Sequence, residues 1–263
     1  VEGFYAHARD WQLDEFPELA LLEARKANAT LSIQAPENTR ALTGIDPARM
    51  ARVARAREPI REQTLRRRWC TTLWPTQANA QQAGASLAAF ETFVSRALFL
   101  DQPDPVRSWG ELRAFQDELI GRLRTARELR IEAEGTDLRL SVKGRTWVNS
   151  DGRRNMPSGE VFTGPLETSA NGTITFDVPS GPAGVDVAGV RLRFEDGVVV
   201  EARAERGDDH LQRALRTDDG ARRLGEIGIG TNFGIDRPVG AILFDEKIGG
   251  TVHLALGRAY EEA

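Results

Sequence analysis

Apolar positions in the first half of the chain alternate between short continuous runs and stretches with helical spacing. Residues 29–35 and 69–74 are short runs, each closed by a proline, and they predict two strands. Residues 47–66 lie between them and are rich in Ala and Arg. They follow Asp46-Pro47, a pair that suits a helix N-terminus. Strands that alternate with helices favour an α/β layer with parallel pairing.

Two further helices are predicted between residues 86 and 123. Ser86 is a suitable N-cap, and the residues after it place apolar side chains on one helical face: Leu87, Phe90, Phe93, Val94 and Leu98. Ser108 and Glu111 match the S-x-x-E capping box, which predicts a helix that starts there and continues to Leu123.

The pattern changes near Glu128, after which short strand-like runs dominate. Residues 129–133 and 138–142 flank a Glu-Gly-Thr-Asp turn signal and predict a hairpin. The other elements predicted in this half are turns at Asn171-Gly172 and Asp196-Gly197, a short helix over 208–216, and strands over 241–244 and 251–256. We therefore expect an α+β protein, with an α/β part over residues 1–128 and a β-rich domain over residues 129–263.

Composition and charge narrow the class of protein. The 263 residues are 40% hydrophobic and 28% charged, which is typical of a soluble globular protein. A net charge of −4 argues against a nucleic-acid partner, and no apolar run has membrane-spanning length. Cys70 is the only cysteine, so an internal disulfide and a cysteine-based metal site are excluded. A single cysteine fits a reducing compartment, and we expect a cytoplasmic protein.

Three separate segments place an acid or an imidazole among glycines. They carry Glu160 after Asn-Met-Pro-Ser-Gly, Glu226 in Gly-Glu-Ile-Gly-Ile-Gly, and His253 in Gly-Gly-Thr-Val-His. Carboxylates and a histidine brought together by folding are the donors of a hydrolytic metal site. Their long spacing matches no short ligand motif, and a lone histidine in a strand is more often a hydrogen-bonded core residue. From the residues alone, the prediction ends at a possible polar site in the β-rich domain.

The same segments resemble the signatures of the aminopeptidase T type family of metalloaminopeptidases, the thermophilic metalloproteases. The resemblance extends over nearly the whole chain and includes these further segments: Trp74-Pro75-Thr76-Gln77-Ala78, Glu134-Gly135-Thr136-Asp137-Leu138, Gly144-Arg145, Thr217-Asp218-Asp219-Gly220-Ala221-Arg222 and Leu256-Gly257-Arg258-Ala259-Tyr260. It implies an N-terminal α/β domain, a C-terminal catalytic domain and a homodimer. It also implies release of N-terminal amino acids from peptide substrates at a site with two divalent metal ions. Carboxylate and imidazole donors suit zinc, cobalt, manganese or magnesium for these ions.

The resemblance also implies roles for particular residues. Glu160, Glu226 and His253 correspond to metal ligands, and Glu226 is the candidate to bridge two metals. Tyr260 matches a tyrosine of the family site, whose phenol stabilises the developing oxyanion or contacts a metal. A bend at Gly257 is needed to bring it towards His253. Glu246 is our candidate for the carboxylate that carries a proton to the leaving amine; alternatively, it pairs with a neighbouring cation and only fixes its loop.

One departure from the family pattern affects the expected activity. The family continues past the tyrosine to a His-x-Asp motif with two more ligands, which this chain does not contain, and neither His7 nor His210 lies in a matching context. We therefore expect an internal piece of a longer enzyme that is inactive, or nearly so, alone.

Two alternative functions remain open from the sequence. The chain could be a non-catalytic binding or scaffolding protein that keeps the family fold without a complete metal site. It could also carry a sugar- or lipid-binding β domain, for which Trp109 or Trp147 would have to be exposed.

Overall fold

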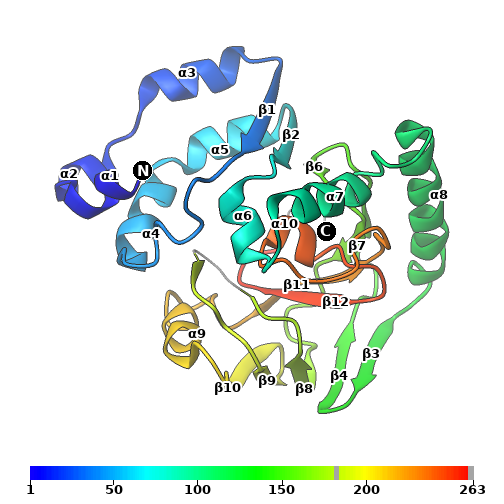
Figure 1. The fold of residues 1–263 in the computed structure, drawn as a ribbon. Helices are drawn as coiled ribbons and strands as arrows, with labels where there is room; N and C mark the ends of the chain where they lie inside the picture. Colours follow the sequence, from blue (N-terminus) through cyan, green and yellow to red (C-terminus); the bar gives the residue numbers. More distant parts are fainter. Residues whose placement is uncertain (181–183, 260–263) are drawn as a thin grey trace.

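A computed structural model describes residues 1–180 and 184–259, which combine helices with β-sheets and confirm the α+β class (Figure 1). The helices are α1 (Glu2–His7), α2 (Asp10–Asp14), α3 (Glu18–Lys26), α4 (Pro47–Ala56), α5 (Glu58–Leu65), α6 (Gln77–Gln82), α7 (Leu87–Ala97), α8 (Pro105–Leu123), α9 (Asp208–Ala214) and α10 (Ile242–Asp245). The strands are β1 (Ala29–Gln34), β2 (Arg68–Leu73), β3 (Glu128–Ala133), β4 (Thr136–Ser141), β5 (Val148–Ser150), β6 (Asn155–Met156), β7 (Glu160–Thr163), β8 (Asn171–Phe176), β9 (Val190–Glu195), β10 (Val198–Arg203), β11 (Leu224–Gly230) and β12 (Val252–Leu256). Among these described helices, none has the length and apolar character needed to cross a membrane.

A small parallel sheet, in the order β1-β2-β6, takes its first two strands from the first half of the chain. Strands β1 and β2 pair in parallel from Ala29 opposite Arg68 onwards, as the alternation of strands and helices predicts. The third strand, β6, comes from the second half of the chain and pairs with β2 through Thr71 and Asn155. The segment just before Glu160 is therefore anchored in the sheet of the first half.

The helices of this half begin and end where local chemistry dictates. The single helix predicted over 47–66 is wrong: α4 and α5 are separate, because Pro59 has no N–H for the continuous hydrogen-bond ladder and its ring clashes with the carbonyl four residues earlier. Ser86 caps α7 as predicted, accepting a hydrogen bond from the Ala89 N–H at 3.2 Å. The predicted start of α8 at Ser108 is also wrong, since Asp104 caps the helix one turn earlier.

A five-stranded antiparallel sheet follows, in the order β10-β9-β8-β4-β3. The predicted β3–β4 hairpin is confirmed, and so is the turn at Asp196-Gly197 between β9 and β10. The turn predicted at Asn171-Gly172 is wrong, because these residues open β8. A Cβ at Gly172 would lie 2.1 Å from the Asp137 carbonyl oxygen, so the glycine allows a close approach of two strands rather than a turn.

The third sheet has the order β12-β11-β7-β5, with β11 antiparallel to both of its neighbours. One face of this sheet packs into a large hydrophobic core through Val161, Ile227 and Leu254. The predicted strand over 251–256 is confirmed as β12.

The strand predicted over 241–244 is wrong, because these residues enter the helical turn α10. Phe244 is fully buried there and packs against Phe93 of α7, with ring centroids 5.5 Å apart. This contact belongs to a second hydrophobic core that joins α6 and α7 to residues 235–248. This core contains residues from both sides of position 128, and strand β6 pairs with a strand from the first half of the chain. The predicted domain boundary at residue 128 stays a prediction. The second core fixes the segment that follows α10 against helices of the first half.

Candidate metal centre

The three predicted ligands meet on one face of the third sheet. Glu160 is the first residue of β7, whereas Glu226 and His253 lie within β11 and β12 rather than on loops. The His253 Nε2 atom is 3.2 Å from Glu160 Oε2 and 3.4 Å from Glu226 Oε1. Folding therefore gathers two carboxylates and an imidazole that are widely separated in the sequence.

Strand register explains why these side chains share a face. Gly228 lies opposite His253 and Gly230 lies opposite Glu160, and residues directly opposite one another on antiparallel strands point to the same face. Glu226, Gly228 and Gly230 are two residues apart and share that face too. A Cβ at Gly228 would stand 2.1 Å from the His253 ring, so the imidazole lies where a side chain on β11 would otherwise be.

The segment after α10 adds Glu246 and Lys247 to the site. The Lys247 ammonium is 3.0 Å from Glu160 Oε1 and 2.8 Å from Glu246 Oε2. Lys247 is 1% exposed, so it is a buried cation, and its carboxylate partners compensate the cost of burial. Glu246 does pair with a neighbouring cation, as the alternative reading of that residue has it. Lys247 was not predicted from the sequence, where it is marked only as a cation between Glu246 and the glycines that precede His253.

Several buried polar atoms at the centre have no hydrogen-bond partner among the described residues. They are Glu160 Oε2 and both ring nitrogens of His253, whose 3.2 Å contact lacks hydrogen-bond alignment. Such atoms cost free energy unless something else binds them. Glu160, Glu246 and His253 each offer a donor atom, and these atoms all lie within 4.8 Å of one another. Carboxylate oxygen and imidazole nitrogen are the donors that a divalent cation such as zinc takes, so the residues fit a metal ion.

The electrostatics of the site are set by burial and by its mixed charges. Burial raises the pKa of the Glu160 carboxyl, although the positive charges of Lys247 and His253 oppose this. Burial lowers the pKa of His253, but the carboxylates of Glu226 and Glu160 outweigh it, so the pKa lies above its usual value. A cation bound there would compete with these protons for the same lone pairs.

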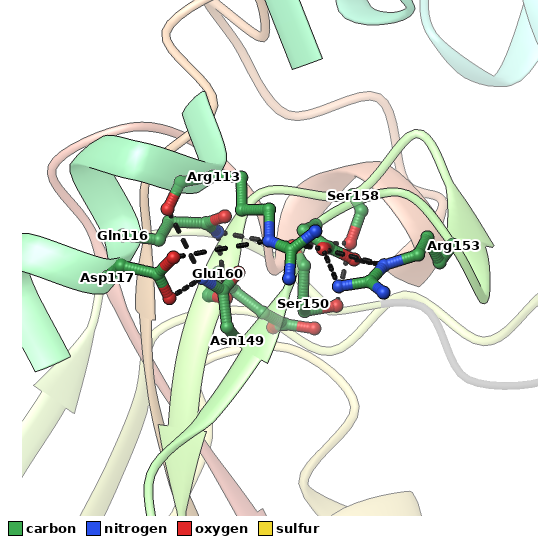
Figure 2. Close-up of polar contacts among 9 residues, drawn as sticks. Arg113, Gln116, Asp117, Asn149, Ser150, Arg153, Ser158 and Glu160 are labelled. Atoms are coloured by element: carbon green, nitrogen blue, oxygen red, sulfur yellow. Dashed lines mark hydrogen bonds and ion pairs between the residues drawn. The ribbon is translucent and has the colours of Figure 1, made fainter. Parts of the chain in front are cut away.

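A second set of polar contacts holds the main chain of Glu160, and Figure 2 shows the side chains of Gln116, Ser150 and Ser158 that take part. Gln116 of α8 is fully buried, and its Nε2 lies 3.0 Å from the Glu160 carbonyl oxygen, 3.0 Å from Thr231 Oγ1 and 3.1 Å from the Ser150 carbonyl oxygen. The Ser158 hydroxyl also donates to the Ser150 carbonyl, at 2.8 Å. A helix of the first half thus fixes the strand end that carries Glu160.

Tyr260 lies outside the described residues, so its predicted place beside His253 stays a prediction. Gly257, where we expected the chain to bend, has a φ of +105°, a conformation that favours glycine. His7 lies in α1 and His210 in α9, and neither belongs to the group of donor atoms around Glu160.

Known proteins that resemble this chain are proteases and aminopeptidases. The model of the thermophilic metalloprotease family (M29) matches residues 1–263. Aminopeptidase 2 of Geobacillus stearothermophilus is 33% identical over 290 residues, covering 97% of this chain and 69% of that protein. Aminopeptidase T of Thermus thermophilus is 34% identical over 185 residues, covering 64% of this chain and 45% of that protein.

A solved structure agrees with these sequence matches. Wild-type AmpT from Thermus thermophilus superposes with a TM-score of 0.83 and 27% identity, covering 98% of this chain and 71% of that one. The chain thus spans about two thirds of the length of some relatives and less than half of others. It belongs to the thermophilic metalloprotease family (M29), a family of metalloaminopeptidase hydrolases.

Proposed function

We propose that this chain carries the metal-binding site of an aminopeptidase that releases N-terminal amino acids from peptides. The proposal is carried by three buried atoms, Glu160 Oε2 and the two ring nitrogens of His253, which have no hydrogen-bond partner within residues 1–180 and 184–259 and lie beside two further carboxylates. Relatives named aminopeptidases supply the substrate class, because the site alone would suit any metal-assisted hydrolysis.

The proposed ligands are Glu160 and His253, which belong to the group of neighbouring donor atoms, and Glu226, whose Oε1 lies 3.4 Å from His253 Nε2. By its family resemblance, Glu226 would be the residue that bridges two divalent ions. Zinc, cobalt, manganese and magnesium are all compatible with carboxylate oxygen, and the first three also suit imidazole. When bound, such ions lower the pKa of water and polarise the scissile carbonyl. Within residues 1–180 and 184–259 the site gathers a single imidazole, so we also propose that efficient turnover needs ligands beyond those described.

Glu246 is the proposed general base, and its exposure supports that assignment over a purely structural one. Its side chain is 35% exposed, whereas that of Glu160 is only 6% exposed. A ligand can be buried, but a carboxylate that moves a proton must reach water and the leaving amine. Glu246 would accept a proton from the attacking water and donate it to the amino group that leaves. The Tyr260 phenol would donate a hydrogen bond to the oxyanion that forms at the carbonyl.

A homodimer in the cytoplasm completes the proposal. The dimer rests on the family resemblance, and the cytoplasmic location rests on the presence of a single cysteine, Cys70. Light scattering on the purified chain tests the dimer directly.

Metal-dependent hydrolysis of leucine p-nitroanilide tests the proposed function. It should be run with zinc, cobalt or manganese, on this chain and on a longer chain that spans the full length of its relatives. Glu160→Gln should lower the rate of metal-dependent hydrolysis by on the order of 100-fold or more, as expected for loss of a ligand. Glu91→Gln is the matched control, because Glu91 is exposed on α7. Absence of turnover and of bound metal in both lengths would instead support the non-catalytic reading.

A further inference from the structure

Lys247 is a buried cation in a site that is otherwise acidic. The chain has three lysines, and Lys247 is the one whose side chain is almost completely buried. Its ammonium contacts one oxygen of Glu160, at 3.0 Å, and one oxygen of Glu246, at 2.8 Å. Burying a lysine is costly unless it is paired, so this double contact is a specific arrangement rather than a solvated surface charge.

The main chain fixes the position from which the ammonium extends. The Lys247 N–H donates to the Phe244 carbonyl oxygen at 2.9 Å, and the Lys247 carbonyl accepts from the Asn232 N–H at 3.0 Å. Phe244 is fully buried in the second hydrophobic core, and Asn232 donates its side-chain amide to the Ser158 carbonyl at 2.9 Å. The lysine is thus tied both to α10 and to the segment that leads into β7.

The two oxygens of Glu160 consequently have different surroundings. Oε1 is held by Lys247, whereas Oε2 faces His253 Nε2 at 3.2 Å and has no hydrogen-bond partner in the described part of the chain. We infer that Lys247 is a positioning residue of the metal centre: its ammonium holds Glu160 and Glu246 together in the metal-free protein and leaves Glu160 Oε2 for the ion. This inference rests on the proposed metal centre.

The charges explain why this role differs from ordinary core packing. Without the ammonium, the buried carboxylate of Glu160 and the partly exposed carboxylate of Glu246 would lie close together with only the imidazole of His253 as a nearby counter-charge. A divalent ion would then compensate these carboxylates more completely than the imidazole of His253 alone. Removing the ammonium should therefore make the stability of the protein depend more strongly on bound metal.

The test is Lys247→Met, which keeps most of the side-chain volume and removes the charge. In EDTA, we expect its melting temperature to fall by roughly 10 °C, as for a broken buried ion pair in a protein of this size. Saturating Co²⁺ should then raise the melting temperature of Lys247→Met by several degrees more than that of the wild type. The visible absorption of bound Co²⁺ should also change, because Glu160 Oε1 is released to the ion.

Two controls separate this role from general destabilisation. Lys143→Met makes the same substitution at an exposed lysine and should match the wild type in every measurement. Leu192→Ala creates a cavity in the large core and should lower the melting temperature without altering the metal-induced shift. If Lys247→Met does not fold, Lys247→Gln replaces it, since glutamine is also neutral.

The outcomes that overturn the inference are specific. A lysine variant with a metal-induced shift no larger than that of the wild type, and an unchanged Co²⁺ spectrum, would show that Lys247 only fills the core. Such a result would leave the proposed metal centre standing. A wild-type chain that gains no stability from any of the metals would overturn the metal centre, and the role of Lys247 with it.

Discussion

Gly228→Ala adds one methyl group directly beneath the predicted histidine ligand. The new Cβ would lie 2.1 Å from the His253 Cε1 and Nε2 atoms, whereas ordinary van der Waals contact begins at 3.4 Å. The ring must therefore retreat by more than about 1 Å, well beyond the roughly 0.2 Å tolerance of metal–ligand distances. Gly228 has no positive φ, so alanine fits the backbone and the whole effect comes from the displaced imidazole.

The expected cost has a structural and a functional part. Overpacking beside β11 should lower the free energy of unfolding by about 1–3 kcal/mol. Displacing a ligand by this distance should weaken metal binding by at least about 10-fold, and turnover of a peptide substrate by about 100-fold. Co²⁺ titration followed by visible absorption measures the first functional loss, and hydrolysis of leucine p-nitroanilide by the metal-loaded protein measures the second.

Gly121→Ala is the matched control for this substitution. Gly121 lies inside α8, and a Cβ there would meet nothing within 4 Å. Alanine should therefore stabilise the helix by about 0.5–1 kcal/mol and leave metal binding unchanged. Wild-type metal affinity and turnover in Gly228→Ala would refute the reasoning, since His253 would then either move freely or not bind the metal.

Two further predictions concern residues around the site. Gln116→Met removes the N–H groups that hold the Glu160 main chain. Urea unfolding should show that the free energy of unfolding falls by about 1–3 kcal/mol, and Co²⁺ affinity should fall about 10-fold. An unchanged Co²⁺ affinity would contradict the role of α8. Burial raises the pKa of the Asp245 carboxyl to about 6, from an ordinary value of 3.8. The folded-state pKa of Asp245 is higher than its unfolded-state pKa. The stability that the protonated carboxyl contributes is therefore fully present below pH 3.8 and is lost as the pH rises through about 6. In EDTA, Asp245→Asn should therefore gain up to about 3 kcal/mol relative to the wild type at pH 7.5 and nothing at pH 4, as urea unfolding at the two pH values would show. Asparagine keeps the Oδ1 acceptor for the Val239 N–H, so an equal gain at both pH values would contradict the assignment.

Local signals predicted the elements whose chemistry is complete within a few residues. The Ser86 cap and the hairpin around residues 134–137 are of this kind, because both depend on contacts between near neighbours in the chain. The helical turn α10 could not be predicted this way. A four-residue apolar run has no periodicity that separates strand from helix, and the burial of Phe244 against the distant Phe93 decides the outcome.

Resemblance could predict which residues bind metal, and that stays a proposal, but it could not predict the contacts of these residues. Nothing in the sequence shows that Glu160 meets a lysine after α10, because the contact depends on how the second core places that segment. The same limit applies to Gln116. In the sequence it is one polar residue within a helix, and only the structure shows that it is buried against the Glu160 main chain. Long-range contacts of this kind are what the structure adds to the set of ligands predicted by resemblance.

The strand register explains why β11 carries glycines at alternate positions. Glu226, Gly228 and Gly230 alternate along one face, and the proposed ligands His253 and Glu160 lie opposite the two glycines. A strand with side chains at both positions would fill the space that the imidazole and the loop after Lys247 occupy. The intervening residues, such as Ile227, face the hydrophobic core and hold the strand in that register, because a slip by one residue would expose them. The Glu-x-Gly-x-Gly pattern thus gives β11 one face that packs into the core and one face that leaves room for His253 and Glu160.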